Sequence, residues 1–309
     1  MSSSTKLSPV TTGFLFAIAS AALFAVRPII VKLIYAQGVD TTTLIALRML
    51  FSVPFYLVLL IYFLRDAERR SRLDAKKTLQ IIGIGMLGYY VASYLDLVGL
   101  KTVTAQLGRM ILYTFPTFVV LFGALFFAKP ITKRVILSLI ITYTGISVIF
   151  GHDLNYFGSD IIVGGLFLTA SAITFACYLL FAKPIIDDVG SRLFTCIALI
   201  GASIGILTHF SITHSIHDAI EITRPAFYYC VFLALFCTVI PTFFTSAAVA
   251  RIGADKTGIV AMTGPIFTSI AAVNIIGEAF TIYHFLGIIF IIAGVAILND
   301  KKQASNSNV

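Results

Sequence analysis

Charged residues are scarce in this chain. Only 12% of its 309 residues are Asp, Glu, Lys or Arg, whereas a soluble domain carries about 25%. The hydrophobic share is 59% and the mean hydropathy is +0.99. A protein of this composition cannot have water as its main solvent. The net charge of +8 does not indicate a nucleic-acid partner either, because the positive residues lie in short loops between apolar segments.

Several catalytic and redox motifs are also missing. No GxxxxGK[ST] sequence occurs, and no connection is long enough for a nucleotide-binding domain, so we expect no direct use of ATP. Neither HExxH nor a Ser–His pair is evident within the apolar segments, which argues against an enzyme. The four cysteines form no CxxC pair and all lie in apolar segments, as small buried hydrophobes do. We therefore predict no catalytic residues, metal or cofactor.

Long apolar segments dominate the chain instead. A helix needs about 20 apolar residues to cross the hydrocarbon core of a bilayer. Ten segments of about this length can be read, and together they predict an all-α membrane protein with ten transmembrane helices. The first is expected to be retained, since no signal-cleavage site follows a short apolar core. Their expected limits are 12–35, 41–64, 79–98, 104–127, 131–150, 161–183, 192–212, 226–248, 255–276 and 281–299.

The two halves of the sequence resemble each other. Ala19-Ser20-Ala21 recurs as Ala170-Ser171-Ala172, which also aligns Gly13 with Gly164. Pro116 aligns with Pro265, and these two prolines are expected to break the fourth and ninth helices. We therefore divide the chain into two repeats, 1–151 and 152–309. Five helices per repeat is an odd number, so the second repeat must be inverted, an arrangement typical of secondary transporters.

The loops between segments predict the orientation. With the N-terminus inside, sixteen Lys and Arg residues fall in inside segments and two in outside segments. This asymmetry indicates an inner (plasma) membrane protein with both termini in the cytoplasm. The lipid bilayer is thus one partner, and the oligomeric state is left open between monomer and homodimer.

These features resemble the drug/metabolite transporter (DMT) superfamily, most of all its EamA type. The likeness is carried by the small-residue first helix from Gly13, by the paired Pro116 and Pro265, by Arg48 in the second helix, and by Gly277-Glu278. It covers essentially the whole chain. It implies a ten-helix inner-membrane carrier with a central cavity. One departure is Lys129-Pro130, which stands where the family usually has Glu.

The repeat and the resemblance together predict the function. We expect a secondary transporter, an exporter by the habit of the family, that moves a small organic metabolite by alternating access. An anionic or zwitterionic substrate, such as an organic acid or an amino acid, fits the charges below. A membrane-embedded enzyme and a channel-like protein are the alternatives.

Three arginines within the apolar segments are the main candidates for substrate binding. Arg27, Arg48 and Arg109 all belong to the first repeat, and a charge inside a span normally faces a cavity or a partner. Their second-repeat equivalents are uncharged, at Tyr178, Leu199 and Gly258. Tyr178 is included in the candidate site as the counterpart of Arg27. Arg48 alternatively binds backbone carbonyls or the carboxylate of the third helix, and Arg109 alternatively pairs with that carboxylate.

Tyrosines and two acids complete the candidate set. Tyr90 and Tyr94 are four residues apart and share a helix face, as do Arg109 and Tyr113. The alternative for these tyrosines is the interfacial aromatic belt. Asp96, the carboxylate of the third helix, is interpreted as a salt-bridge partner or a proton-coupling group.

Residues outside the candidate site receive structural interpretations. Glu278 is expected to cap the end of the ninth helix or the start of the tenth. His209, His214 and His217 fall at or after the outer end of the seventh helix and are interpreted as solvated loop residues rather than as a zinc site.

Overall fold

The computed structural model describes residues 8–66, 71–127 and 131–306, apart from the side chains of 127, 254–255 and 298–306. Within these ranges all regular structure is helical. Nine helical segments are long and apolar enough to cross a membrane, and the shorter apolar helix at 282–297 makes a tenth. The predicted all-α fold with ten spans is thereby confirmed. The departure from the family pattern at Lys129-Pro130 lies outside the described residues.

The first repeat supplies five spans, two of which depart from a regular α-helix. The third span is continuous but contains a π-helical stretch, η1, and the fourth divides into α6 and α7. The helices are α1 (Pro9–Ala36), α2 (Thr41–Leu64), α4 (Ala75–Gly85), η1 (Met86–Val91), α5 (Ala92–Gly99), α6 (Ala105–Leu112), α7 (Phe115–Phe127) and α8 (Lys133–Phe157).

The second repeat has the same plan. Its eighth span contains the π-helical stretch η2, and the ninth begins within the α13 helix after a break at Gly253. The helices are α9 (Asp160–Val189), α10 (Ser191–Thr213), α11 (Ile216–Ile220), α12 (Arg224–Ala234), η2 (Leu235–Val239), α13 (Ile240–Ala261), α14 (Gly264–Ile276) and α15 (Ile282–Asn306).

Short polar side chains set the helix starts. Asp40 caps α2 by accepting hydrogen bonds from the amides of Thr42 and Thr43, and Asp74 and Thr104 cap α4 and α6 in the same way. These caps satisfy amides that have no partner within the helix. Gly253 has a φ of 85°, which is unfavourable for other residues, and it interrupts α13 at that point.

The interruptions recur at one spacing. The stretches η1 and η2 start at Met86 and Leu235, and the breaks before α7 and α14 follow Tyr113 and Met262, so both pairs are 149 residues apart. Pro265 lies in the first turn of α14. The repeat seen in the sequence is therefore also a repeat of backbone geometry, down to the positions where α-helical hydrogen bonding fails.

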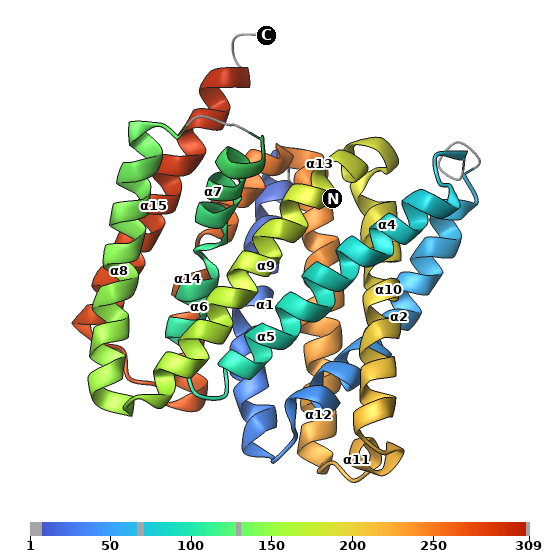
Figure 1. The fold of residues 1–309 in the computed structure, drawn as a ribbon, viewed down its shortest axis with the longest axis horizontal. Coiled ribbons are helices and arrows are strands. Elements are labelled where there is room, and N and C mark those ends of the chain that lie inside the picture. The colour runs from blue at the N-terminus through green and yellow to red at the C-terminus, as the bar shows by residue number, and fades with distance from the viewer. Residues whose placement is uncertain (1–7, 67–70, 128–130, 307–309) are drawn as a thin grey trace, which may run out of the picture.

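The fifth spans of the two repeats pack against each other in opposite directions. A methyl group added at Gly145 would lie 2.9 Å from the carbonyl oxygen of Gly287, and one added at Gly294 would lie 2.9 Å from that of Ser138. Residue numbers thus rise along α8 as they fall along α15. Each contact is the repeat-related copy of the other, as expected for elements related by a two-fold axis. The pair forms one edge of the bundle (Figure 1).

The first helix of each repeat packs against the other repeat. α1 runs along α13 and α14, and α9 runs along α5, α6 and α7. The close approaches match as well, because Gly13 meets Arg251 and Ile252 where Gly164 meets Thr102 and Val103. α1, α9 and α13 occupy the middle of the bundle, with α2, α4 and α10 at the edge opposite α8 (Figure 1). The halves of the sequence thus interdigitate in space.

We predict that Gly145→Ala weakens the packing of α8 on α15. The new methyl group would lie 2.7 Å from Cβ of Phe290, so the helices must separate, at a cost of about 1–3 kcal/mol in the free energy of unfolding. Denaturant titration of the detergent-solubilised protein measures this change. Gly151→Ala in the same helix is the matched control, since nothing lies within 4 Å of its added methyl group. Equal stability of the two variants would contradict the close packing.

Candidate functional site

A salt bridge joins two of the candidate residues. Arg27 of α1 donates from Nη2 to Oδ2 of Asp96 in α5 at 2.7 Å. The Asp96 side chain is only 5% exposed and that of Arg27 is 21% exposed. The alternatives for Arg48 and Arg109 include a pair with Asp96, but the structure pairs Asp96 with Arg27. The bond also joins α1, the first span of this repeat, to the end of its third span.

A small cavity lies beside this pair. Arg27, Asp96 and Arg109 line it together with Pro28, Leu100, Gly108 and Leu112. The centre of a water molecule can occupy about 10 Å³ of this cavity. This volume is about what a single water molecule needs. In this conformation the three charged side chains therefore surround a space too small for an organic metabolite.

Polar atoms in this region lack partners. Nε of Arg27, Nε of Arg109 and Oδ1 of Asp96 are buried without a hydrogen bond, and so is Nε of Arg48. Buried polar groups in folded proteins are nearly always bonded, so each such atom needs an explanation. A polar ligand in this region could bond to the three guanidinium donors and the one carboxylate acceptor.

Arg48 is the most buried of the three arginines. Arg48 lies on α2 and is 3% exposed. Its charge is close enough to interact electrostatically with those of Arg27 and Asp96. No bond joins Arg48 to Asp96 in the described residues. The region therefore carries three positive charges against one negative charge.

Arg109 and Tyr113 lie where the repeats meet. The guanidinium carbon of Arg109 is 5.1 Å from the centre of the Tyr113 ring, within the range of a cation–π interaction. The Tyr113 hydroxyl donates to the carbonyl oxygen of Ala261 at 2.6 Å, just before the break that precedes α14. A side chain at Gly264 would collide with that hydroxyl. The expected pairing of cation and ring thus also connects the break in the fourth span with the break in the ninth.

Tyr90 and Tyr94 form a separate aromatic group with His209. The Tyr90 hydroxyl is 2.8 Å from Nδ1 of His209, and the Tyr94 ring centre is 5.5 Å from that of His209. The prediction that His209 is a solvated loop residue is wrong, because the residue lies within α10 and is partly buried. α10 extends to Thr213, which places this histidine a full turn inside the helix.

Of the other two histidines of this region, His214 is partly buried and His217 is exposed. His214 follows α10 and has Nε2 3.3 Å from Oδ1 of Asp40, and His217 lies in the short helix α11. Burial alone would raise the pKa of Asp40, but hydrogen bonds from Thr43 and Thr42 outweigh it and hold the pKa below its ordinary value. Asp40 is therefore the fixed negative charge of the loop between α1 and α2.

Tyr178 lies apart from the arginines. Its side chain is buried against Phe175 and Phe194, and its hydroxyl donates to the Tyr89 hydroxyl at 3.0 Å. It does not line the cavity formed by Arg27, Asp96 and Arg109. The repeat counterpart of Arg27 is thus part of an apolar core, and its hydrogen-bond partner Tyr89 is indicated by no sequence pattern.

Glu278 caps a helix, but a different one from those expected. Its carboxylate accepts from the amides of Ala105 at 2.7 Å and Gln106 at 3.3 Å, which are the first amides of α6. A carboxylate at a helix start is favourable because it satisfies free amides and opposes the helix dipole. The linker between α14 and α15 therefore holds the start of the helix that carries Arg109.

Comparison with known proteins places this arrangement in context. A protein of known crystal structure shares 14% sequence identity with this chain, and the match covers 93% of this chain and 97% of that protein. The two superpose with a TM-score of 0.61, which establishes a common fold. An uncharacterized transporter of Bacillus subtilis (strain 168), YcbK, is 24% identical over 298 residues, 94% of each chain. A second uncharacterized transporter of that strain, YetK, is 22% identical over 70% of this chain and 66% of its own.

The family comparison covers both repeats. The sequence profile of the EamA-like transporter family matches twice, at residues 11–151 and 162–300. The two matched stretches correspond to the two five-span repeats of the structure. The protein is thus a multi-pass membrane transporter rather than an enzyme. This chain belongs to the EamA-like transporter family.

Proposed function

We propose that this protein is a secondary transporter that carries a small organic anion or zwitterion out of the cell by alternating access. The observation that carries the proposal is the surplus of buried positive charge around Asp96. Arg27, Arg48 and Arg109 each bury a guanidinium nitrogen without a partner. Removing charge from water is costly unless a counter-charge is present. A carboxylate on the substrate would supply that counter-charge and the missing acceptors.

The charge is asymmetric although the scaffold is symmetric. The second-repeat counterparts of the three arginines, Tyr178, Leu199 and Gly258, carry no charge. A ligand at this site therefore binds the guanidinium groups through one end. Its remaining atoms contact apolar and aromatic side chains such as Leu112 and Tyr113. This pattern supports a substrate with one carboxylate and a small organic body, such as an organic acid or an amino acid.

The repeat supports alternating access. Antiparallel equivalents such as α8 and α15 indicate two repeats inserted in the membrane in opposite orientations, each of which can form one of two exchanging faces. The fourth and ninth spans are broken at equivalent positions, and Arg109 and Tyr113 lie beside the first break. Since the halves interdigitate, we assign the movement to these broken helices and their neighbours, not to two separate halves.

Charge in the connecting segments supports the orientation. Lys and Arg concentrate in the segments at one end of the bundle, which we assign to the cytoplasm together with both termini. The loop of Asp40 and the linker of Glu278 then face the outside. A plasma-membrane location follows from this assignment.

We expect binding to depend on ligand charge. The purified protein in detergent is heated with L-glutamate, L-malate or citrate, and in parallel with L-lysine or putrescine. An anion that binds the folded state raises the melting temperature, whereas the two cations should leave it unchanged. Stabilisation by the cations alone would contradict the proposal. In proteoliposomes, uptake of the anion that binds should saturate, because linear uptake at high concentration would indicate a channel.

Arg109→Gln should weaken that binding by about tenfold or more, because a hydrogen bond to a charged group contributes roughly 1.5–3 kcal/mol. The dissociation constant is measured by titrating the anion that stabilised the wild type. Arg251→Gln is the matched control, since Arg251 is an exposed arginine of α13 that stacks on Phe16 instead. Equal affinity of the two variants would remove Arg109 from the binding site.

Asp96→Asn should destabilise the protein, because it leaves Arg27 without its counter-charge. Breaking a buried pair costs about 3 kcal/mol or more. The double variant Arg27→Gln/Asp96→Asn should recover part of this loss, and unfolding titrations of all four proteins measure the coupling. Asp187→Asn, in the exposed pair with Lys183, is the control and should change stability little. Additive effects of the two substitutions would show that the pair is not coupled.

A further inference from the structure

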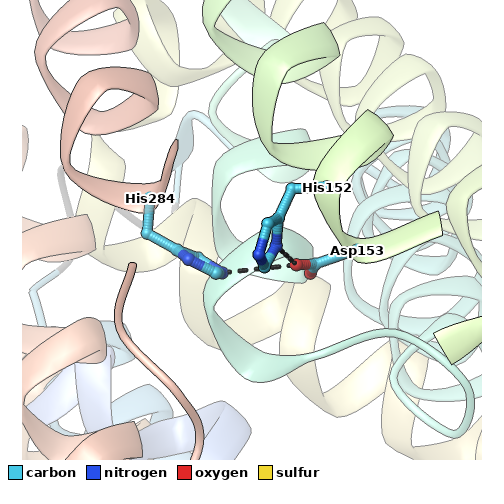
Figure 2. Close-up of side chains that lie close together, drawn as sticks. All are labelled: His152, Asp153 and His284. Carbon is cyan, nitrogen blue, oxygen red and sulfur yellow. Dashed lines mark hydrogen bonds and ion pairs between the residues drawn. The ribbon is translucent and has the colours of Figure 1, made fainter. Parts of the chain in front are cut away.

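Two histidines and one aspartate meet at the end of the bundle where the linker between α14 and α15 lies. His152 and Asp153 come from the last turns of α8, and His284 comes from the first turn of α15 (Figure 2). One ligand atom from each lies within 4.8 Å of the other two. Asp153 is fully buried, the His284 side chain is 3% exposed and that of His152 is 21% exposed. The transport site described above uses none of the three.

Two of the three distances between their ligand atoms suit a tetrahedral metal ion. Nδ1 of His152 is 3.1 Å and Nε2 of His284 is 3.4 Å from Oδ1 of Asp153. Ligand atoms bound to zinc at 2.0–2.2 Å in tetrahedral geometry are about 3.4 Å apart. Imidazole and carboxylate together favour zinc among the common divalent ions, whereas Mg²⁺ and Ca²⁺ prefer oxygen ligands alone.

The neighbouring groups hold these ligand atoms in place. The Thr104 hydroxyl donates to Oδ2 of Asp153 at 3.0 Å, which leaves Oδ1 directed at the histidines. On the far side of His284, Nδ1 is 2.8 Å from the Thr281 hydroxyl oxygen, which can accept a hydrogen bond from Nδ1–H and so leave Nε2 unprotonated for a metal. Partners of this kind orient the ligands in known zinc sites.

A second tautomer of His284 also fits its surroundings. The Thr281 amide lies 3.3 Å from Nδ1 of His284 and can donate to it. In that tautomer Nε2 carries the proton and donates to Asp153. Metal binding then requires the proton to move from Nε2 to Nδ1, where the N–H can donate a hydrogen bond to the Thr281 hydroxyl oxygen in place of the contact with the Thr281 amide.

We propose that His152, Asp153 and His284 bind one zinc ion, with the fourth position open on the exposed side of His152. The ion would tie the end of α8 to the start of α15. Thr104 extends this connection, because its hydroxyl donates to Asp153 and accepts from the amide of Leu107 as the cap of α6. A bound zinc ion therefore clamps three helices from both repeats at one end of the bundle.

The test uses the full-length protein purified with a tag that contains no histidine, in buffer free of chelators. After dialysis against ZnCl₂, elemental analysis should find one zinc per chain, and ZnCl₂ should raise the melting temperature while MgCl₂ and CaCl₂ do not. His152→Ala and His284→Asn should each weaken zinc binding at least tenfold. His217→Ala is the matched control, because that histidine lies in α11 outside the cluster, and it should bind zinc as the wild type does.

Three results would overturn the proposal. These are no zinc bound to the wild type, unchanged affinity in both cluster variants, or a melting temperature that responds to pH but not to zinc. The last result would mark the cluster as a hydrogen-bonded group only. If His284→Asn does not fold, His152→Ala decides alone, because the partly exposed ring of His152 stacks on Tyr283 and is not part of the core.

Discussion

The pairing of Arg27 with Asp96 is the interaction on which the arrangement of charge depends. A single arginine in the apolar interior of a membrane protein is costly, and this chain buries three around one acid. The bond satisfies one oxygen of Asp96 and one nitrogen of Arg27, so the remaining positive charge has no counterpart within the described residues of that region. The same bond joins α1 to α5 and so forms one wall of the cavity with Arg109. The bond between Arg27 and Asp96 thus both holds two helices together and leaves unpaired positive charge beside the cavity.

The surrounding scaffold is symmetric, and its symmetry includes its irregularities. The π-helical stretches and the helix breaks recur 149 residues apart, and close glycine contacts occur in matched pairs. A break in α-helical hydrogen bonding inside a membrane is tolerated only where protein or a cavity satisfies the freed groups. At the second break, Tyr113 does so from the other repeat by donating to the carbonyl oxygen of Ala261. The breaks are therefore places where the repeats meet, and the charged residues of one repeat are placed beside them.

Much of the fold could be predicted from the sequence because the bilayer imposes a simple rule on span length. The expected limits of the second span agree with α2, and Pro116 and Pro265 marked both helix breaks. The ends of the fifth and tenth spans are predicted least well, since the expected limits are 150 and 299 whereas α8 continues to Phe157 and α15 to Asn306. Polar residues such as His152 and Asp153 lower the apolarity of a segment even when tertiary contacts keep the helix intact. The cluster with His284 was missed for this reason.

Side-chain partners far apart in the sequence could be predicted only in part. The stacking of Arg109 on Tyr113 follows from a separation of four residues on one helix. Glu278 and His209 find partners more than a hundred residues away, and no local pattern indicates which helix start or which tyrosine will be nearest. The repeat alignment also placed Tyr178 opposite Arg27 in sequence, yet equivalent backbone positions face different surroundings once the side chains differ.

The interdigitated packing has a consequence for biosynthesis. α1 is made first, but its neighbours α13 and α14 lie more than 200 residues later. At a synthesis rate of about 5–20 residues per second, this helix waits on the order of 10–50 s in the lipid before its partners are made. During that time Arg27 can pair with Asp96, which is made far earlier than either partner helix. An early ion pair between the first and third spans therefore neutralises the charge of Arg27 in the lipid until the second repeat has been synthesised.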